Sequence, residues 1–182
     1  MSIGALPMIA FAFAGALAAR AGEWSPAVEV RNDEERCVSY RARLDGPYLV
    51  VQATHEAGWH TYAMDNKRRA DEKLAGRESL GAERPTEIKL TGGLTVEGPW
   101  YQSPPKDTSK PELNWFTWVF EGQALFAAKV RRAGATPARI GVRGQVCTES
   151  ACRNIDITIP LPAAGAAAVA SEVNLKDLVK VR

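Results

Sequence analysis

The stretch Gly144–Arg153, which is GQVCTESACR, separates two cysteines by four residues and lies between two segments with strand-like alternation, 138–143 and 155–159. A short connection between antiparallel strands brings the flanking residues opposite each other, with Cα atoms roughly 4.5–5.5 Å apart. A disulfide tolerates that separation. The sequence therefore predicts a β-hairpin in which Cys147 and Cys152 can be bonded.

Segments with the same period-2 alternation recur before this hairpin and are separated by turn signals such as Gly92-Gly93. They are residues 37–44, 48–54, 59–62, 87–90, 115–120 and 124–130. Together with the hairpin they predict an all-β protein, a single antiparallel β-sandwich over residues 24–162. The charge-rich stretch 66–84 is expected to hold a short helix around Arg68–Leu74. The prolines between Pro99 and Pro111 predict a long loop there.

The first 21 residues have the features of a secretory signal peptide. Met1–Ala19 carries no charged side chain, and its apolar run 8–17 is followed by a small-x-small pattern that ends at Ala21. We therefore expect an exported protein, periplasmic in a bacterium with two membranes, with cleavage after Ala21. The alternative is an uncleaved anchor helix, and no other contact with a membrane is expected.

The composition is that of a globular domain without a strong field of one sign. Lys and Arg number 23 and Asp and Glu 21, so the net charge is +2 and no nucleic-acid partner is expected. The two histidines, His55 and His60, leave little material for a metal site, and no cofactor is expected. Cys37 lies on an expected strand as a buried free thiol. Residues 163–182 are expected to form an Ala-rich linker and a short tail, with a helix that begins at Ser171.

The span that a bridge closes indicates what the bridge is for. Closing about five residues constrains the unfolded chain by roughly 2 kcal/mol, whereas a Cys37–Cys147 bridge would contribute nearly 5. A local bridge in a turn therefore contributes little to stability, and it lies within reach of a partner thiolate. The spacing alone is equally compatible with a structural hairpin disulfide, and capture of a soft metal ion by the reduced thiols is a third alternative. Glu149 inside the turn would disfavour a neighbouring thiolate, and Arg153 would favour one.

Three segments occur in a characteristic order along the chain. The first is GWHTY at Gly58–Tyr62, the second is GPWY at Gly98–Tyr101 followed by 116–130, and the third is the cysteine stretch followed by 155–160. In this order they resemble the N-terminal periplasmic domain of the thiol:disulfide interchange protein DsbD, a family of immunoglobulin-like redox modules. The resemblance spans about residues 25–162.

The resemblance implies an immunoglobulin-like sandwich with a redox-active Cys147–Cys152 disulfide. In the family this pair accepts electrons from a membrane partner and passes them to periplasmic oxidoreductases, with attack usually at the second cysteine, here Cys152. The implied activity is thiol-disulfide exchange. The implied partners are thioredoxin-like or membrane-embedded thiol-disulfide oxidoreductases that act in trans. The alternative is a non-catalytic exported binding sandwich in which the same disulfide is structural.

The resemblance also implies the surroundings of the pair. The aromatic strand places His60 and Tyr62 beside the sulfur atoms. The region Trp100–Lys106 falls where the family has a cap loop that shields them, so Trp100 and Tyr101 are expected near the disulfide. The other aromatic residues of the expected strands, Trp115 among them, are expected mostly in the core.

Overall fold

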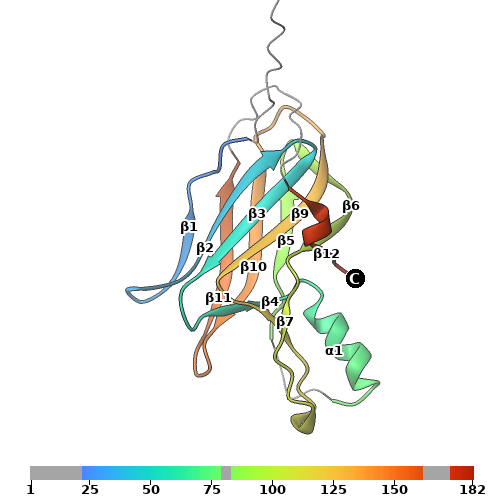
Figure 1. Cartoon of the computed structure of the whole chain (residues 1–182). Helices are drawn as coiled ribbons and strands as arrows, with labels where there is room; N and C mark the ends of the chain where they lie inside the picture. Colours follow the sequence, from blue (N-terminus) through green and yellow to red (C-terminus); the bar gives the residue numbers. More distant parts are fainter. Residues whose placement is uncertain (1–21, 79–82, 162–172) are drawn as a thin grey trace, which may run out of the picture.

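Two antiparallel sheets pack face to face in the computed structural model, which describes residues 22–78, 83–161 and 173–182 (Figure 1). The first sheet has the order β1 (Val28–Asn32), β2 (Glu35–Asp45), β3 (Tyr48–His55), β9 (Gln123–Arg132), β6 (Leu94–Gln102) and β12 (Val179–Lys180). The second sheet has the order β11 (Cys152–Pro160), β10 (Arg139–Cys147), β4 (His60–Tyr62), β8 (Trp118–Phe120) and β7 (Lys106–Asp107), with β5 (Glu87–Thr91) also paired to β10. The predicted all-β, immunoglobulin-like antiparallel β-sandwich is confirmed.

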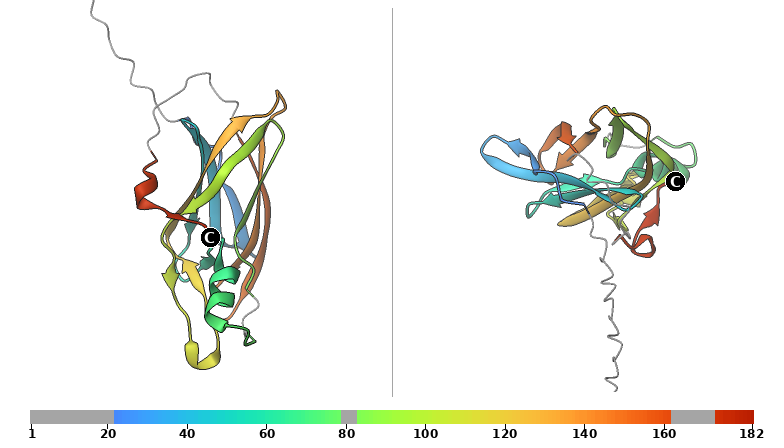
Figure 2. Two further views of the ribbon diagram at one scale, coloured as in Figure 1. Left: turned by 90° about the vertical axis from the view of Figure 1, so that its right-hand side faces the viewer. Right: turned by 90° about the horizontal axis from the view of Figure 1, so that it is seen from above.

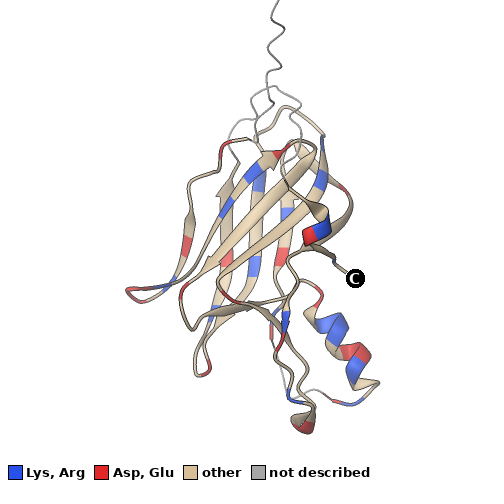
Figure 3. Ribbon diagram, viewed as in Figure 1, with Lys and Arg blue, Asp and Glu red and all other residues tan. Residues whose placement is uncertain are grey.

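The core lies between the two sheets and is built by alternation along the strands. Side chains of successive strand residues point to opposite faces, so every second residue of a strand faces the partner sheet. The main core contains inward residues of both sheets, and those on β2, β3, β9 and β10 include Val38, Tyr40, Ala42, Leu49, Val51, Ala53, Ala124, Phe126, Ile140, Val142 and Val146. Cys37, near the start of β2, is buried in the same cluster. Polar and charged residues take the intervening positions, and Figure 3 shows both signs scattered over strands and helix.

The helix α1 (Asn66–Leu74) confirms the short helix expected around Arg68–Leu74. It buries Asn66, Ala70 and Leu74, which are four residues apart and therefore share one face. The Asn66 side chain accepts a hydrogen bond from the backbone N–H of Trp118 at 2.7 Å, which fixes the start of the helix against β8. Ala75 ends it in the left-handed conformation, with φ at 50°.

The long loop predicted between Pro99 and Pro111 is wrong. Strand β6 runs on through Pro99 to Gln102, β7 follows at Lys106–Asp107, and the 3-10 turn η1 spans Pro111–Leu113. Pro99 is tolerated because the pairing of β6 with β9 is irregular between Val96 and Trp100. A bulge leaves residues without ladder hydrogen bonds, so the missing N–H of proline costs nothing there.

The C-terminal tail lies along the first sheet (Figure 2). Its described part forms a 3-10 turn η2 (Leu175–Asp177) and then β12, which pairs with β6. The helix expected here is therefore wrong for the described residues, since strand pairing to the β6 edge satisfies the backbone instead, and Ser171 lies outside them. No helix in the described ranges is long and apolar enough to cross a membrane. The signal peptide expected at residues 1–21 lies outside those ranges, and the 24–162 boundary stays a prediction.

Candidate redox site

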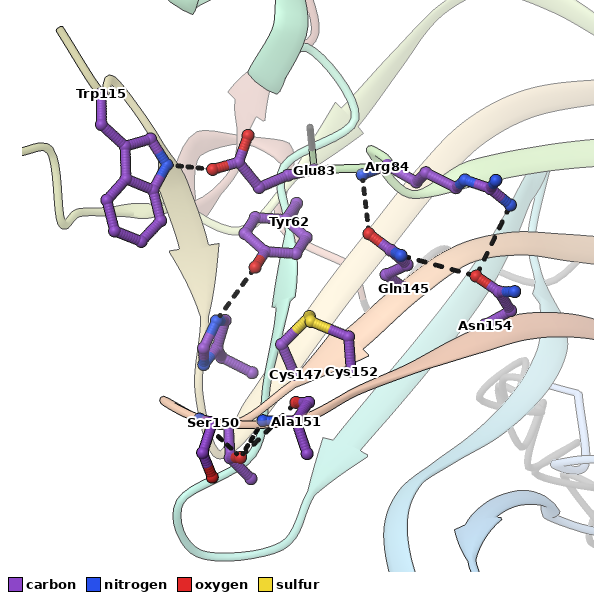
Figure 4. Close-up of a disulfide and its surroundings, with 12 residues drawn as sticks. Tyr62, Glu83, Arg84, Trp115, Gln145, Cys147, Ser150, Ala151, Cys152 and Asn154 are labelled. Atoms are coloured by element: carbon purple, nitrogen blue, oxygen red, sulfur yellow. Dashed lines mark hydrogen bonds between the residues drawn. A yellow bond between two sulfur atoms is a disulfide. The ribbon is translucent and has the colours of Figure 1, made fainter. Parts of the chain in front are cut away.

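The cysteine hairpin joins β10 to β11 and carries a disulfide at its end. Cys147 and Cys152 are opposite each other in the register, with Cα atoms 4.1 Å and sulfur atoms 2.10 Å apart (Figure 4). The Thr148 N–H donates to the Ala151 carbonyl at 2.7 Å, so the cysteines occupy the non-hydrogen-bonded pair next to it. Such pairs bring side chains closest together, which explains why the spacing of these cysteines permits a bond.

The disulfide lies on the outer face of the second sheet. Cys147 forms a small apolar cluster with Tyr62 and Val119 that is separate from the main core. The neighbours Val146 and Thr61 point inward, as the alternation of β10 and β4 requires. Cys147 is only 1% exposed, whereas Cys152 is exposed. The bond therefore joins an exposed cysteine beside the solvent to a covered one.

His60 and Tyr62 are both beside the disulfide, where the resemblance implied them. His60 is the register partner of Cys147, and its Nε2 is 3.3 Å from the Tyr62 hydroxyl. Burial lowers the pKa of His60, and burial, followed by the charge of Glu83, raises the pKa of Tyr62 to about 12. At neutral pH both rings are therefore uncharged, and the immediate surroundings of Cys147 hold no full charge from these two side chains.

A pocket of about 460 Å³ opens beside Cys152. Its lining comes from the cysteine hairpin, from β4 and from the segments before β5 and β8, namely Tyr62, Glu83, Leu113, Trp115, Gln145, Thr148, Glu149, Ser150, Ala151 and Cys152. No pattern in the sequence predicted Leu113, Trp115 or Glu83 at this site. Trp115 had been expected in the core, but it is half-buried outside the main core, and its indole N–H donates to the Glu83 carboxylate (Figure 4). The sequence signal that was available is an apolar residue, Leu113, in a proline turn where no core alternation requires one.

A polar chain connects the cysteine hairpin to the segment that precedes β5. The Arg84 N–H donates to the Gln145 side-chain oxygen at 3.2 Å, and the Arg84 guanidinium is 3.5 Å from the Asn154 oxygen. Gln145 in turn donates to that oxygen at 3.5 Å (Figure 4). Gln145 and Asn154 share the outer face with the disulfide, so these contacts fix the wall of the pocket against the hairpin.

Trp100 and Tyr101 do not lie at this pocket, contrary to the cap-loop expectation. They are in β6 of the other sheet, where they pair with Ala128 and Ala127. The physical reason is the bulge described above, which lets the strand continue where a loop was expected. The segment that reaches the pocket is instead the connection between β7 and β8, which carries Leu113.

Arg153 and Glu149 differ in their relation to the sulfur atoms. Arg153 follows Cys152 on β11 and points to the opposite face, where its side chain bonds Asn32 and is 3.9 Å from the Asp33 carboxylate. Glu149 is exposed in the turn and lines the pocket with Cys152. The structure thus places Glu149 at the disulfide and turns Arg153 away from it.

Cys37 is the third cysteine and is a buried free thiol in the main core, as predicted. Its side chain is 0% exposed, and burial, with a smaller contribution from the charge of Glu35, raises the pKa of the thiol. Within residues 22–78, 83–161 and 173–182, no three His, Cys, Asp or Glu side chains gather into a group that could hold a metal ion.

Comparison with known proteins identifies the fold through solved structures. No family model matches the chain, and no curated protein matches it in sequence. The N-terminal periplasmic domain of ScsB from Proteus mirabilis aligns over 76% of this chain with a TM-score of 0.53 and 13% identity. This chain spans about half of that one, 50%. The reduced DsbD N-terminal domain of Neisseria meningitidis aligns over 78% of this chain and 86% of that domain, at 16% identity and a TM-score of 0.41, a likeness from which we draw no conclusion. The chain has the fold of the N-terminal periplasmic domain of ScsB, which supports the DsbD-like N-terminal domain that the resemblance implied.

Proposed function

We propose that the protein is an exported thiol-disulfide exchange module that accepts and passes a pair of electrons through Cys147 and Cys152. The observation that carries this proposal is the asymmetry of the disulfide, in which Cys152 is exposed beside a pocket and Cys147 is covered. Exchange requires that one sulfur atom can be reached by an attacking thiolate along the line of the S–S bond.

The proposed reaction starts with a dithiol protein as reductant. One of its thiolates attacks the sulfur of Cys152, a mixed disulfide forms, the Cys147–Cys152 bond breaks, and Cys147 leaves as a thiolate. The second thiolate of the reductant then attacks the sulfur of the reductant's first cysteine in the mixed disulfide, and Cys152 is released as a thiolate. The reductant ends as a disulfide, and two electrons and two protons have moved to the cysteine pair. The same steps in reverse pass the electrons to an oxidised partner.

The surroundings of the pair support this chemistry. The bond closes so short a segment that its entropic contribution to stability is roughly 2 kcal/mol, so breaking it leaves most of the fold's stability in place. His60 and Tyr62 are uncharged and cover Cys147, which limits access of water and oxidants to that sulfur. The Glu149 carboxylate lines the pocket together with Cys152 and disfavours a thiolate on that cysteine.

The proposed location is the periplasm or another exported compartment. A solved structure with the same fold is a periplasmic domain, and residues 1–21 have the composition of a signal peptide for which we propose cleavage after Ala21. An oxidising compartment is also where a local disulfide forms and persists. The proposed partners are thioredoxin-like proteins and membrane-embedded thiol-disulfide oxidoreductases.

The decisive experiment is the reduction potential of the Cys147–Cys152 pair, measured by titration with glutathione or dithiothreitol. We expect a value between about −270 and −120 mV, the span of exchange proteins, and not below about −300 mV, where structural disulfides lie. Cys147→Ala and Cys152→Ala are each expected to abolish catalytic electron transfer from a thioredoxin-like reductant, with the circular-dichroism spectrum retained.

Cys37→Ala is the matched control, since it removes a cysteine from the core and leaves the pair intact. It is expected to keep the potential and the exchange rate of the unmodified protein. A potential well below −300 mV by this titration, or unchanged electron transfer in both pair variants, would refute the exchange function and leave a structural hairpin disulfide in a binding module.

A further inference from the structure

Leu113 is exposed in a way that the packing of the domain does not explain. Leu113 is 46% exposed, and no other large apolar residue in the described part of the chain is classed as exposed. It lines the pocket beside Cys152 together with the rings of Trp115 and Tyr62. An exposed apolar side chain next to an attackable sulfur is what a partner-binding surface requires.

The turn that carries Leu113 is held in place by its own contacts. Asn114 ends η1 with φ at 51°, and its N–H donates to the Pro111 carbonyl at 3.0 Å. Lys110 and Trp115 form a bridge across the turn, with hydrogen bonds of 2.6 and 3.2 Å in the two directions. The side chain of Asn114 also accepts a hydrogen bond from Arg77 at 2.9 Å. Leu113 is therefore presented to solvent by a braced turn.

The indole ring of Trp115 is also held by contacts with its neighbours. The Lys110 ammonium lies 5.1 Å from the centre of the Trp115 ring, and the indole N–H is bonded to Glu83. These contacts orient the ring, so that Trp115 and Leu113 form an apolar ledge at one side of the pocket.

The charged residues that line the pocket are all acidic. Glu83 and Glu149 contribute carboxylates, and no Lys, Arg or His is among the described residues that line this pocket. Glu83 is bonded to the Trp115 indole, whereas Glu149 is exposed at the tip of the hairpin. A ligand that enters beside Cys152 therefore meets an apolar ledge on one side and the Glu149 carboxylate at the hairpin.

We propose that this pocket receives the cysteine-bearing segment of the partner, with an apolar residue next to the partner cysteine on the ledge and a basic residue facing Glu149. This inference rests on the proposed function and names the chemistry that selects the partner. The apolar residue removes the ledge from water, and the basic residue offsets the repulsion that Glu149 exerts on the incoming thiolate. The sulfur chemistry is the mixed-disulfide step written above.

The test uses the oxidised full chain and short blocked peptides with a single cysteine. The peptides carry leucine-cysteine-arginine, serine-cysteine-arginine or leucine-cysteine-glutamate, and the rate of mixed-disulfide formation at Cys152 is followed by mass spectrometry. Each rate is divided by the rate of the same peptide with oxidised glutathione, which removes the intrinsic reactivity of its thiol. We expect leucine to be preferred over serine by about fivefold, from burial of its side chain. Arginine is expected to be preferred over glutamate by about threefold, as for an exposed charge pair.

Variants assign each preference to a residue. Leu113→Ser is expected to remove the preference for leucine, whereas Leu113→Met keeps it because the side chain stays apolar and similar in size. Glu149→Gln is expected to remove the preference for arginine. Glu23→Gln, an exposed carboxylate on the N-terminal segment beside the other sheet, serves as the charge control and is expected to change nothing.

The outcomes separate this inference from the function on which it rests. If dithiothreitol reduces the pair at an exchange-type potential but the peptide preferences are absent or unaffected by Leu113→Ser and Glu149→Gln, the docking inference is wrong and the exchange function stands. A potential in the structural range refutes both. A concentration-dependent dimer in sedimentation that Leu113→Ser dissolves would overturn the inference in favour of a second copy on the ledge.

Discussion

Cys37 and Cys152 lie in opposite environments, one buried in the core and one exposed on the outer face of a sheet. Cys37 lies between the two sheets at 0% exposure, and burial raises the pKa of its thiol. Cys152 lies on the outer face of the second sheet, exposed at the end of a hairpin and bonded to Cys147. The chemistry of a cysteine depends on access and on the stability of its thiolate, so the fold makes the first inert and the second available.

The two histidines repeat this contrast more mildly. His55 is 7% exposed and lies inside, with Nδ1 2.8 Å from the Gly122 carbonyl and Nε2 2.9 Å from the Thr61 hydroxyl. His60 is half-buried on the outer face, beside Tyr62 and opposite Cys147. For both residue types, the member inside the sandwich has a structural environment, and the member on the outer face of the second sheet lies at the disulfide.

The largest expected difference between the two environments is in thiol modification. After mild reduction of the native protein, iodoacetamide is expected to alkylate Cys152 at least about 100-fold faster than Cys37, because Cys37 reacts only after local opening of the core. Peptide mapping by mass spectrometry over a time course measures both rates. The same reaction in 6 M guanidinium chloride (a concentration of about twice the usual unfolding midpoint) is the control, in which the rates should converge. Comparable rates in the native protein would place Cys37 within reach of solvent.

Reduction of the disulfide is expected to have a moderate effect on stability. The bridge closes a segment with a sequence separation of 5, so its loss should lower the free energy of unfolding by roughly 2 kcal/mol and the melting temperature by about 5 °C. Thermal unfolding with and without a reductant checks this value, and Cys37→Ala should show the same difference because it retains the pair. A protein that no longer folds when reduced would contradict the picture of an exchange site on a stable scaffold.

The smallest expected effect is a loss of stability between pH 7 and pH 5.5. Burial lowers the pKa of both His55 and His60, so the unfolded chain binds protons at its ordinary histidine pKa near 6.5 while the folded protein does not. Stability from this source is complete above pH 6.5 and decreases as the pH falls below it. Urea unfolding at pH 7, 6 and 5.5 measures the slope. His55→Gln should reduce that slope, and an unchanged slope would show that His55 does not cause it.

The strand pattern and the hairpin could be predicted from the sequence because they depend on local chemistry. Alternation of apolar and polar residues predicted β2, β3 and β9 within about two residues, which is the usual uncertainty of strand ends. It also predicted β10 and β11, but both strands extend further toward the cysteines than the segments 138–143 and 155–159. The prediction of a loop at Pro99 was wrong because proline is compatible with a strand at a bulge. That bulge depends on the register between β6 and β9, which are separated by many residues in the chain.

The residues around the disulfide were predictable only in part. His60 and Tyr62 are adjacent to Cys147 because β4 pairs with β10, and the resemblance anticipated this. Trp115 and Glu83 meet at the pocket through a contact between segments that have no pattern in common. Arg153 had been expected to act on the sulfur atoms, but the alternation of β11 turns it toward Asn32 on the opposite face.

The sequence by itself determined the local elements of this protein, namely the strands, the short helix, and the spacing that lets Cys147 and Cys152 bond across a hairpin. These follow from periodicity and from the geometry of a single turn, which involve only residues close in the chain. The tertiary structure alone decided which cysteine of the pair is exposed, which residues line the pocket and which cysteine is buried in the core. Those properties arise from the packing of two sheets, whose contacts join residues far apart in the sequence, so no local pattern records them.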